Sequence, residues 1–401
     1  MKELGLVTHS TSPRGGMVHT LALAEALQAA GQAVHVVTQG DPAAGLFRPT
    51  TVPFTVLPAP PGGGSLADKV FTSIDLLSGA LGDVAHRFDV LHTQDCIAAR
   101  AAARVRDAGA AVAVVRTVHH VDDFTTPALV ACQRAAIREP DRVLVVSEQW
   151  RRILRDEYAR EAVVVPNGVD PDRFPPVAPA RLAELRAAVG AEDRFLFLSV
   201  GGVEPRKGTH VAVEALAELK ATMPHPPMLV IVGGHSFRDY AAYRTETLER
   251  LPDLGLELGR DVVLLGTLSE ADLGAWYRGA DALCFPSLKE GWGLAVLEAM
   301  AADLPVVASD LPVFREYLLH RHNALMPHAG DGAALARAMQ EMYADRALRR
   351  RLRTGGRETL ARYTWAASAR RHLAVYDDVR AGVGHPAGQG GPDGARRATL
   401  R

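Results

Sequence analysis

Short apolar runs alternate with helix-like segments along most of this 401-residue chain. Each run holds four to six residues between turn-forming residues, which fits one buried strand and is too short for a helix. The expected strands lie at residues 4–8, 33–38, 89–92, 112–117 and 143–146, and then at 195–200, 228–232, 262–265, 282–285 and 304–308. Such alternation predicts an α/β chain. Because 401 residues exceed what one core usually supports, we expect two domains.

Composition is that of an ordinary soluble globular protein, with 48% hydrophobic and 23% charged residues. The formal net charge of -1 argues against non-specific binding to nucleic acid, which needs a basic surface. The three cysteines, Cys96, Cys132 and Cys284, have neither zinc nor redox spacing and predict no disulfide framework. No leader-like segment opens the chain, and no apolar stretch approaches the ~20 residues of a membrane helix, so we expect a cytoplasmic protein.

The stretch 281–316 combines a strand, a glycine-bearing turn and a helix. Its apolar run at 282–285 stops at a proline, and apolar residues recur at helical spacing from Leu294. Glycines let backbone amides approach a ligand, and a helix N-terminus suits a phosphate. Glu290 in the turn and Glu298 in the helix can border one ligand, and their carboxylates suit the hydroxyl pairs of a sugar or ribose. The alternative is a plain α/β unit with both glutamates solvated.

A second phosphate-friendly geometry occurs near the start of the chain. Gly15 and Gly16 stand just before an expected helix at 18–30, although an ordinary strand-to-helix turn remains open as the alternative. The spacing is not the dinucleotide-binding fingerprint, and the glycine-rich loop at 58–65 lacks the lysine of a P-loop. His19 can either touch a ligand at this turn or pack against its neighbours.

Histidines and aspartates gather after the expected strand 112–117, in the run TVHHVDD. His119, His120, Asp122 and Asp123 are all metal-ligand types, but neighbours on an extended chain point apart, so a metal site is the less favoured interpretation. Ligands of α/β proteins bind at the carboxyl ends of parallel strands, so we expect this run to face one.

Together these strings resemble the retaining glycosyltransferases of family 4, which have the GT-B fold. The resemblance rests on PSLKEGWGLAVLEAMAADLPVVASD at 286–310, VPNGVDPDRF at 165–174 and RKG at 206–208, and it spans roughly residues 4–380. It implies two Rossmann-like domains facing each other across a cleft. The implied division is an acceptor-side domain at 1–175, a nucleotide-sugar domain at 176–364, and a helix at 365–380 that packs back on the first domain.

The resemblance also implies roles for single residues. His119 would approach the donor sugar, Lys207 the donor phosphates, Glu290 the sugar hydroxyls and Glu298 the ribose. The catalytic candidates are His119, Lys207 and Glu290; the donor-binding candidates are Gly15, Gly16, Arg206, Lys207, Gly266, Thr267, Leu268, Glu290, Gly291, Trp292, Gly293, Leu294 and Glu298; the acceptor-side candidates are His19, His92 and Asp95. The donor substrate is a nucleotide diphosphate sugar, and no metal or other cofactor is required on this account.

Two positions depart from the family pattern. Gly202 stands where most relatives carry an arginine, and Arg206 would have to replace that charge. Asp303 stands where most carry a glycine, and we expect only a local effect on the backbone. The string at 165–174 is favoured as a hinge between the domains without ligand contact.

A helical pattern dominates after residue 331, with expected helices at 333–343, 346–363 and 365–379. The second is expected to be interrupted at Gly355 and Gly356. It also carries a basic cluster, for which a solvated face is favoured over a membrane-surface patch. That cluster is Arg349, Arg350, Arg351 and Arg353. Residues 382–401 are rich in Gly, Pro and Ala and predict a disordered tail.

The sequence therefore predicts an enzyme that moves a sugar from a nucleotide diphosphate to an unknown acceptor with retention, by departure and attack on one face. A nucleotide-sugar epimerase or a phosphorylase on the same scaffold is the first alternative. A non-enzymatic sugar-binding protein is the second, and it would not need the cations at 206–207. The pattern carries no signal for the nucleotide base, the sugar or the oligomeric state.

Overall fold

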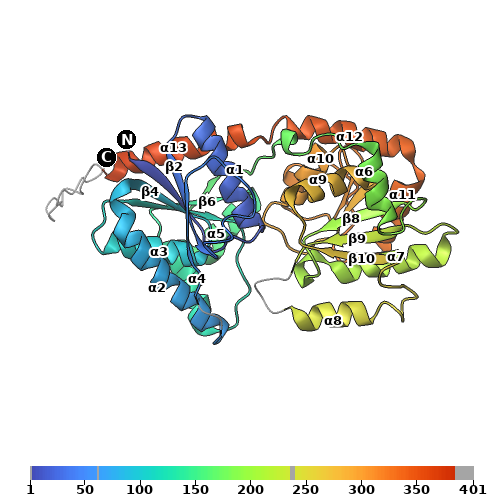
Figure 1. The fold of residues 1–401 in the computed structure, drawn as a ribbon, viewed down its shortest axis with the longest axis horizontal. Coiled ribbons are helices and arrows are strands. Elements are labelled where there is room, and N and C mark those ends of the chain that lie inside the picture. Colours follow the sequence, from blue (N-terminus) through green and yellow to red (C-terminus); the bar gives the residue numbers. More distant parts are fainter. Residues whose placement is uncertain (1, 61–62, 235–239, 384–401) are drawn as a thin grey trace, which may run out of the picture.

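The computed structural model describes residues 2–60, 63–234 and 240–383. Its strands form two parallel sheets, as predicted (Figure 1). The first has the order β3-β2-β1-β4-β5-β6-β7 and consists of β1 (Glu3–Val7), β2 (Val34–Gly40), β3 (Phe54–Pro58), β4 (Phe88–Thr93), β5 (Ala113–Val118), β6 (Arg142–Val145) and β7 (Val163–Val164). The second has the order β10-β9-β8-β11-β12 and consists of β8 (Leu196–Val200), β9 (Met228–Val232), β10 (Val262–Gly266), β11 (Ala282–Phe285) and β12 (Val306–Ala308). Every predicted strand is present; the short edge strands β3 and β7 were not predicted.

Helices cover both faces of the first sheet. Alternate residues of β1 show the division, because Leu4 and Leu6 pack under one set of helices and Val7 packs under the other. The first set is α1 (Gly15–Ala29) and α13 (Trp365–Val383). The second set is α2 (Leu66–Val84), α3 (Cys96–Asp107) and α4 (Pro127–Arg138). Helix α5 (Glu148–Tyr158) is capped by Ser147, whose side chain accepts from the backbone nitrogen of Trp150.

The second sheet is covered in the same way, so both domains are Rossmann-like (Figure 1). Helices α6 (Pro179–Ala187), α9 (Glu270–Gly279) and α10 (Leu294–Ala301) contribute to one apolar cluster. Helices α7 (Thr209–Thr222), α8 (Ala241–Glu249), α11 (Gly332–Ala344) and α12 (Arg346–Leu360) contribute to the other. Four of the helices, α2, α4, α6 and α8, were not predicted from the sequence.

The predicted interruption of α12 at its two glycines is wrong. The helix is continuous, and Gly355 packs against the 322–323 turn, where an added Cβ would lie 2.3 Å from the carbonyl oxygen of His322. The arginines of α12 also do not form one solvated face. Arg349 lies over the Phe195 ring at 5.3 Å, whereas Arg351 donates to the carbonyl oxygen of Arg321.

Two chain segments cross between the domains side by side. In the first crossing segment, Gly168 packs against the second crossing segment. A Cβ added to Gly168 would lie 2.2 Å from the backbone nitrogen of Trp365. After the second crossing α13 runs along α1 and the first sheet, and Arg380 pairs there with Asp89 at 3.1 Å (Figure 1). We propose that the domain boundary lies at the first crossing, near residue 175. Residues 384–401, which hold most of the predicted tail, lie outside the described residues.

Candidate active site

Each sheet reverses its winding between two neighbouring strands, β1 and β4 in the first sheet and β8 and β11 in the second. Segments that leave the carboxyl ends of such strands diverge, and α/β proteins bind ligands in the gap between them. In the second sheet these segments are the loop 201–208 and the turn 286–293. In the first they start at Thr8 and at Gln94.

The loop and the turn of the second sheet meet in a buried ion pair. Lys207 places Nζ 2.6 Å from Oε1 of Glu290 and 4.5 Å from the centre of the Phe285 ring. Ser287 donates to the same oxygen at 3.0 Å, and Arg206 lies 3.4 Å from it. Burial lowers the pKa of Lys207, and attraction to Glu290 offsets this only in part. Burial alone would raise the pKa of Glu290, but the two cations outweigh it and hold this pKa below its usual value.

Helix α10 begins four residues after Glu290. Gly293 has a φ of +86°, and an added Cβ would lie 2.5 Å from the Phe314 ring, so the position requires glycine. No side chain caps the helix and no acidic residue stands in its first turn, which leaves the N–H groups of Leu294 and Ala295 for a ligand, while that of Val296 donates to the carbonyl oxygen of Gly293. The side chain of Trp292 is buried in the core, so this donor-binding candidate can contribute only its backbone.

Glu298 projects from the same helix toward α9. Its Oε2 accepts from the hydroxyl of Tyr277 at 2.8 Å. Burial raises the pKa of Glu298, while the Tyr277 hydrogen bond and the charges of Arg173 and Lys207 oppose the rise. Both predicted glutamates thus lie within the electrostatic range of Lys207.

The turn 286–293 also touches the first domain. The backbone of Gly291 packs so closely on His119 that an added Cβ would lie 2.1 Å from the His119 carbonyl oxygen. One residue earlier, the carbonyl oxygen of Glu290 accepts from the indole nitrogen of Trp150 at 3.2 Å. The turn that carries Glu290 therefore forms part of the contact between the two domains.

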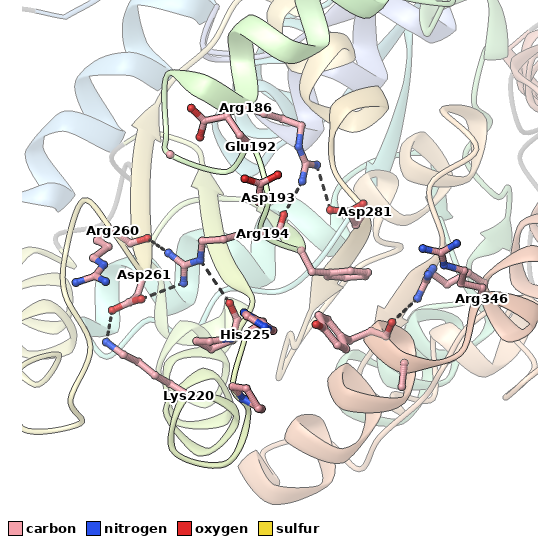
Figure 2. Close-up of a pocket in the computed structure, with 17 residues that line it drawn as sticks. Arg186, Glu192, Asp193, Arg194, Lys220, His225, Arg260, Asp261, Asp281 and Arg346 are labelled. Carbon is pink, nitrogen blue, oxygen red and sulfur yellow. Dashed lines mark hydrogen bonds and ion pairs between the residues drawn. The ribbon is translucent and has the colours of Figure 1, made fainter.

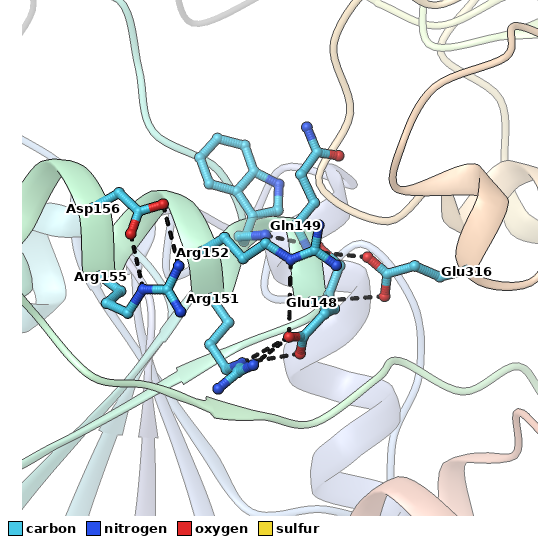
Figure 3. Close-up of polar contacts among 9 residues, drawn as sticks. Glu148, Gln149, Arg151, Arg152, Arg155, Asp156 and Glu316 are labelled. Atoms are coloured by element: carbon cyan, nitrogen blue, oxygen red, sulfur yellow. Dashed lines mark hydrogen bonds and ion pairs between the residues drawn. The ribbon is translucent and has the colours of Figure 1, made fainter.

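Two further contacts join the domains beside this turn. Lys289 pairs with Asp123 at 2.8 Å. Figure 3 shows the carboxylate of Glu316 pointing at the start of α5, where its oxygens accept from the backbone nitrogens of Glu148 and Gln149 at 2.9 and 3.0 Å. Unpaired N–H groups and the helix dipole stabilise a carboxylate at such a position. Glu316 thus ties the second domain to a helix of the first.

His119 follows β5 as a neutral side chain. Its Nε2 lies 3.0 Å from Oε1 of Gln94, which assigns the ring proton to Nε2. Burial lowers the pKa of His119 to about 3, and the charges of His120 and Arg116 add to the effect. The metal-like neighbours diverge, because His120 turns toward Asp122 at 3.5 Å. Across the described ranges no group of three or more His, Cys, Asp and Glu side chains is placed to hold a metal ion.

The three acceptor-side candidates, His19, His92 and Asp95, all have partners inside the first domain. His92 is fully buried, and both ring nitrogens have partners inside the protein, one of them the Tyr376 hydroxyl at 2.7 Å. His19 is fully buried on the same face of the sheet, and its Nδ1 lies 2.9 Å from Oδ1 of Asn167. Asp95 caps α3. His92 and His19 are closed off from solvent because α13, far away in the sequence, covers the face of the sheet toward which they point.

Among the remaining donor-side candidates, the three glycines border open space. A Cβ added at Gly15 or Gly16 would meet nothing within 4 Å, and no side chain caps the start of α1. Gly266 has a φ of +69° and lines a cavity of about 310 Å³ at the carboxyl ends of β9 and β10. Thr267 follows it, and Leu268 packs on the apolar core.

A cavity of about 850 Å³ lies at the opposite edge of the second sheet, where the strands begin (Figure 2). Its wall includes Arg186, which pairs with Asp281 at 3.1 Å. Arg194 and Lys220 pair with Asp261 at 3.0 and 2.6 Å. The lining holds six arginine and lysine side chains against four carboxylates, and the cavity lies away from the candidate site.

Two family descriptions match the chain, Glycosyltransferase Family 4 over residues 13–173 and Glycosyl transferases group 1 over residues 183–359. The D-inositol 3-phosphate glycosyltransferase of Xylanimonas cellulosilytica is 32% identical, with 91% of this chain and 92% of that protein covered. The chain belongs to the family 4 glycosyltransferases. A second member, the phosphatidyl-myo-inositol mannosyltransferase of Mycobacterium leprae, is 30% identical over 92% of this chain and 94% of its own.

The glycosyltransferase also shares its GT-B fold with solved structures. The Anabaena protein Alr3699/HepE, in complex with UDP and glucose, superposes with a TM-score of 0.80 at 19% identity, with 94% of this chain and all of that chain covered. Among the helices that the structure describes, none combines the length and apolar character needed to cross a membrane.

The two departures from the family pattern have local structural reasons. Gly202 has a φ of +74°, and a Cβ there would lie 2.9 Å from the carbonyl oxygen of Gly234, so the glycosyltransferase has no room for a side chain at this position. Asp303 adopts a φ of +58° and pairs with Arg357 at 2.5 Å, which agrees with the expected local effect.

Several contact residues of the site were missed in the sequence. Ser287 and Glu316 lie within the motif-bearing stretch, and the Ser-x-x-Glu spacing before Glu290 was an available signal for the first. Gln94 and Tyr277 come from other elements. No local pattern marks them, because only the fold brings them to His119 and Glu298.

Proposed function

We propose that this glycosyltransferase transfers a sugar from a nucleotide diphosphate donor to its acceptor with retention of the anomeric configuration. The observation that carries the proposal is the Lys207–Glu290 ion pair, 2.6 Å long, just before the uncapped N-terminus of α10. A buried cation and free amide hydrogens side by side suit a diphosphate. The adjacent carboxylate suits the hydroxyls of the sugar that the diphosphate carries.

In this proposal the leaving diphosphate replaces Glu290 as the partner of Lys207. The bond between the anomeric carbon and the diphosphate oxygen breaks, and its electron pair stays on the diphosphate. Lys207, Arg206 and the first amides of α10 stabilise that growing charge. The acceptor hydroxyl attacks on the same face and gives its proton to the departing diphosphate oxygen.

The remaining candidates position the donor. Glu290, freed from Lys207, accepts hydrogen bonds from hydroxyls of the sugar. Glu298 accepts hydrogen bonds from the hydroxyls of the ribose. His119 is neutral, with its Nε2 proton directed at Gln94, so it offers Nδ1 as an acceptor toward the reacting sugar. Gly15 and Gly16, whose surroundings are open, admit the diphosphate from the side of the first domain.

The nature of donor and acceptor is proposed by analogy with the relatives. A uridine nucleotide is proposed because Alr3699/HepE is described in complex with UDP. An inositol-type acceptor is proposed because two sequence relatives are named for inositol-containing compounds.

The test combines binding with product analysis. We expect UDP and UDP-sugars to raise the melting temperature, because a ligand that binds only the folded state stabilises it. A panel of nucleotide sugars with inositol acceptors should then yield a glycoside whose anomeric configuration, read by NMR, matches the donor. A product of inverted configuration, or sugar released only in the presence of phosphate, would contradict the proposal. Glu298→Ala should weaken nucleotide binding, and unchanged affinity in calorimetry would remove Glu298 from the ribose site.

A further inference from the structure

A buried arginine in the first domain has no partner. Arg116 on β5 exposes only 4% of its surface, and its Nε and Nη1 atoms are sealed from solvent without a hydrogen-bond acceptor. Within the described part of the chain the guanidinium group forms no hydrogen bond and no ion pair. Removing a charge from water without compensation is expensive, so native proteins rarely keep such a group unless something else completes it.

No described neighbour of Arg116 forms an ion pair with it, although the carboxylates of Asp95 and Asp122 are close enough to act on its charge. Strand alternation turns Arg116 away from the face where Thr117 meets His92, and toward α3 and α4. Cys96 at the start of α3 and Cys132 in α4 are close enough to act on its charge. Burial raises the pKa of both thiols, that of Cys96 to about 12, so both remain neutral at physiological pH.

Asp95, one of the two carboxylates that act on Arg116, is held by other partners. Asp95 accepts from the hydroxyl of Thr8 at 3.0 Å, from the backbone nitrogen of His9 at 2.9 Å and from that of Ala98 at 2.8 Å. Its Oδ2 also lies 3.1 Å from the His9 ring. Asp95 holds the start of α3 to the loop after β1 and forms no ion pair with Arg116.

The position of Arg116 connects this unmet charge to the active site. It stands at the carboxyl end of β5, three residues before His119, and its charge contributes to the low pKa of that histidine. Lys207 lies on the other domain, where the donor diphosphate is proposed to bind. An anion at Arg116 would therefore enter from the side of the first domain, and Nη2 is not among the sealed atoms.

We propose that Arg116 is a binding residue for an anionic group, a phosphate or a carboxylate, carried by the acceptor substrate. The proposal rests on the glycosyltransfer proposed above and narrows its acceptor class. The anion completes the hydrogen bonds that the guanidinium lacks, and it orients the acceptor hydroxyl toward the cleft. The competing explanation is an ordered water molecule that serves Arg116 in a purely structural role.

The first experiment measures anion binding without knowledge of the acceptor. The protein is saturated with UDP, which occupies the donor site, and its melting temperature is followed against sodium phosphate and sodium acetate, with sodium chloride at equal ionic strength as reference. We expect a saturable rise with one of the two anions, and the responding anion identifies the chemistry. Lys220→Met, which removes a lysine that pairs with Asp261 outside the cleft, should keep this response, whereas Arg116→Met should lose it.

The second experiment separates binding from structure. Without ligand, Arg116→Met should melt roughly 2–4 °C higher than the wild type, because a similar-sized apolar side chain removes an unpaired buried charge. Arg116→Lys should retain part of the anion response. A lower melting temperature of Arg116→Met together with an unchanged anion response would overturn the proposal in favour of the structural role.

Failure of this inference can be distinguished from failure of the proposed function. If the wild type binds UDP and transfers sugar but shows no anion response beyond that of chloride, the Arg116 proposal is wrong while glycosyltransfer stands. If the wild type binds no nucleotide or nucleotide sugar, the proposed function falls, and the Arg116 proposal falls with it. Once an acceptor is identified, Arg116→Lys should raise its KM at least tenfold and leave UDP affinity in calorimetry unchanged.

Discussion

Replacing Gly291 with alanine tests whether the contact between the domains sets the geometry of the site. The added Cβ would lie 2.1 Å from the His119 carbonyl oxygen, whereas Cβ atoms approach other atoms no closer than about 3.0 Å. The turn and the His119 segment must therefore separate by about 1 Å. Since Glu290 and His119 flank this contact, the separation moves the two walls of the site apart. A misplacement of about 1 Å can cost about 100-fold in rate, or roughly 2.7 kcal/mol of transition-state stabilisation.

The assay compares turnover, nucleotide affinity and stability in the same variant. We expect Gly291→Ala to lower kcat by about 100-fold with saturating substrates, while UDP affinity in calorimetry changes far less, because the nucleotide is held by the second domain. The matched control is Gly79→Ala, at an exposed position of α2 where an added Cβ meets nothing within 4 Å. It should stabilise the protein by about 0.5–1 kcal/mol and leave the rate unaltered. A kcat of Gly291→Ala within twofold of the wild type would refute the reasoning.

Three further predictions follow from single contacts. Lys207→Met should lower turnover by about 10²–10³-fold, as loss of a preorganised positive group does, whereas Lys220→Met, whose ammonium pairs with Asp261 outside the cleft, should not; equal losses would contradict the role of Lys207. Gly168→Ala should lower the free energy of unfolding in urea by about 1–3 kcal/mol, because its Cβ would lie 2.2 Å from the backbone of the second crossing, and an unchanged value would mean that the crossings separate freely. Burial lowers the pKa of His372 to about 4, so between pH ~6.5 and 4 the unfolded chain binds a proton that the folded protein does not, and stability should fall as the pH falls through this window; His372→Gln should reduce the slope by up to about 1.4 kcal/mol per pH unit, and an unaltered slope would show that His372 is not held neutral.

The strand, turn and helix at the centre of the second domain could be predicted from the sequence, because each local pattern agrees with the fold. The run at 282–285 is too short for a helix, the following turn carries Gly291 and Gly293, and apolar residues then recur at helical spacing. In the structure these become β11, a turn that reaches His119, and α10. The glycines allowed the turn to be predicted, but not what each one contacts. Gly293 faces the Phe314 ring within its own domain, whereas Gly291 faces the backbone of the other domain.

Where sequence reasoning failed, the missing information was tertiary. His92 and His19 stand next to glycine-rich or polar segments that look like ligand loops, yet α13 covers both of them. The hydrogen bond between His92 and Tyr376 joins residues 284 positions apart, and no local periodicity can indicate it. The same limitation hid Arg116, since an arginine in a β-branched run gives no sign of whether a carboxylate will face it. Helices α2, α4, α6 and α8 were likewise not predicted from the sequence.

Donor binding and domain contact share one turn, and this has a mechanistic consequence. The carboxylate of Glu290 holds Lys207, while its own backbone carbonyl accepts from Trp150 of the first domain. In the proposed reaction a diphosphate takes over Lys207, and Glu290 then loses the partner of its carboxylate, while its backbone carbonyl is itself part of the domain contact. We therefore expect binding of the donor to affect the Trp150 hydrogen bond directly, because both contacts belong to Glu290. Donor binding should thus be coupled to the domain contact through this turn, and a variant such as Trp150→Phe should weaken that coupling while leaving the nucleotide contacts in place.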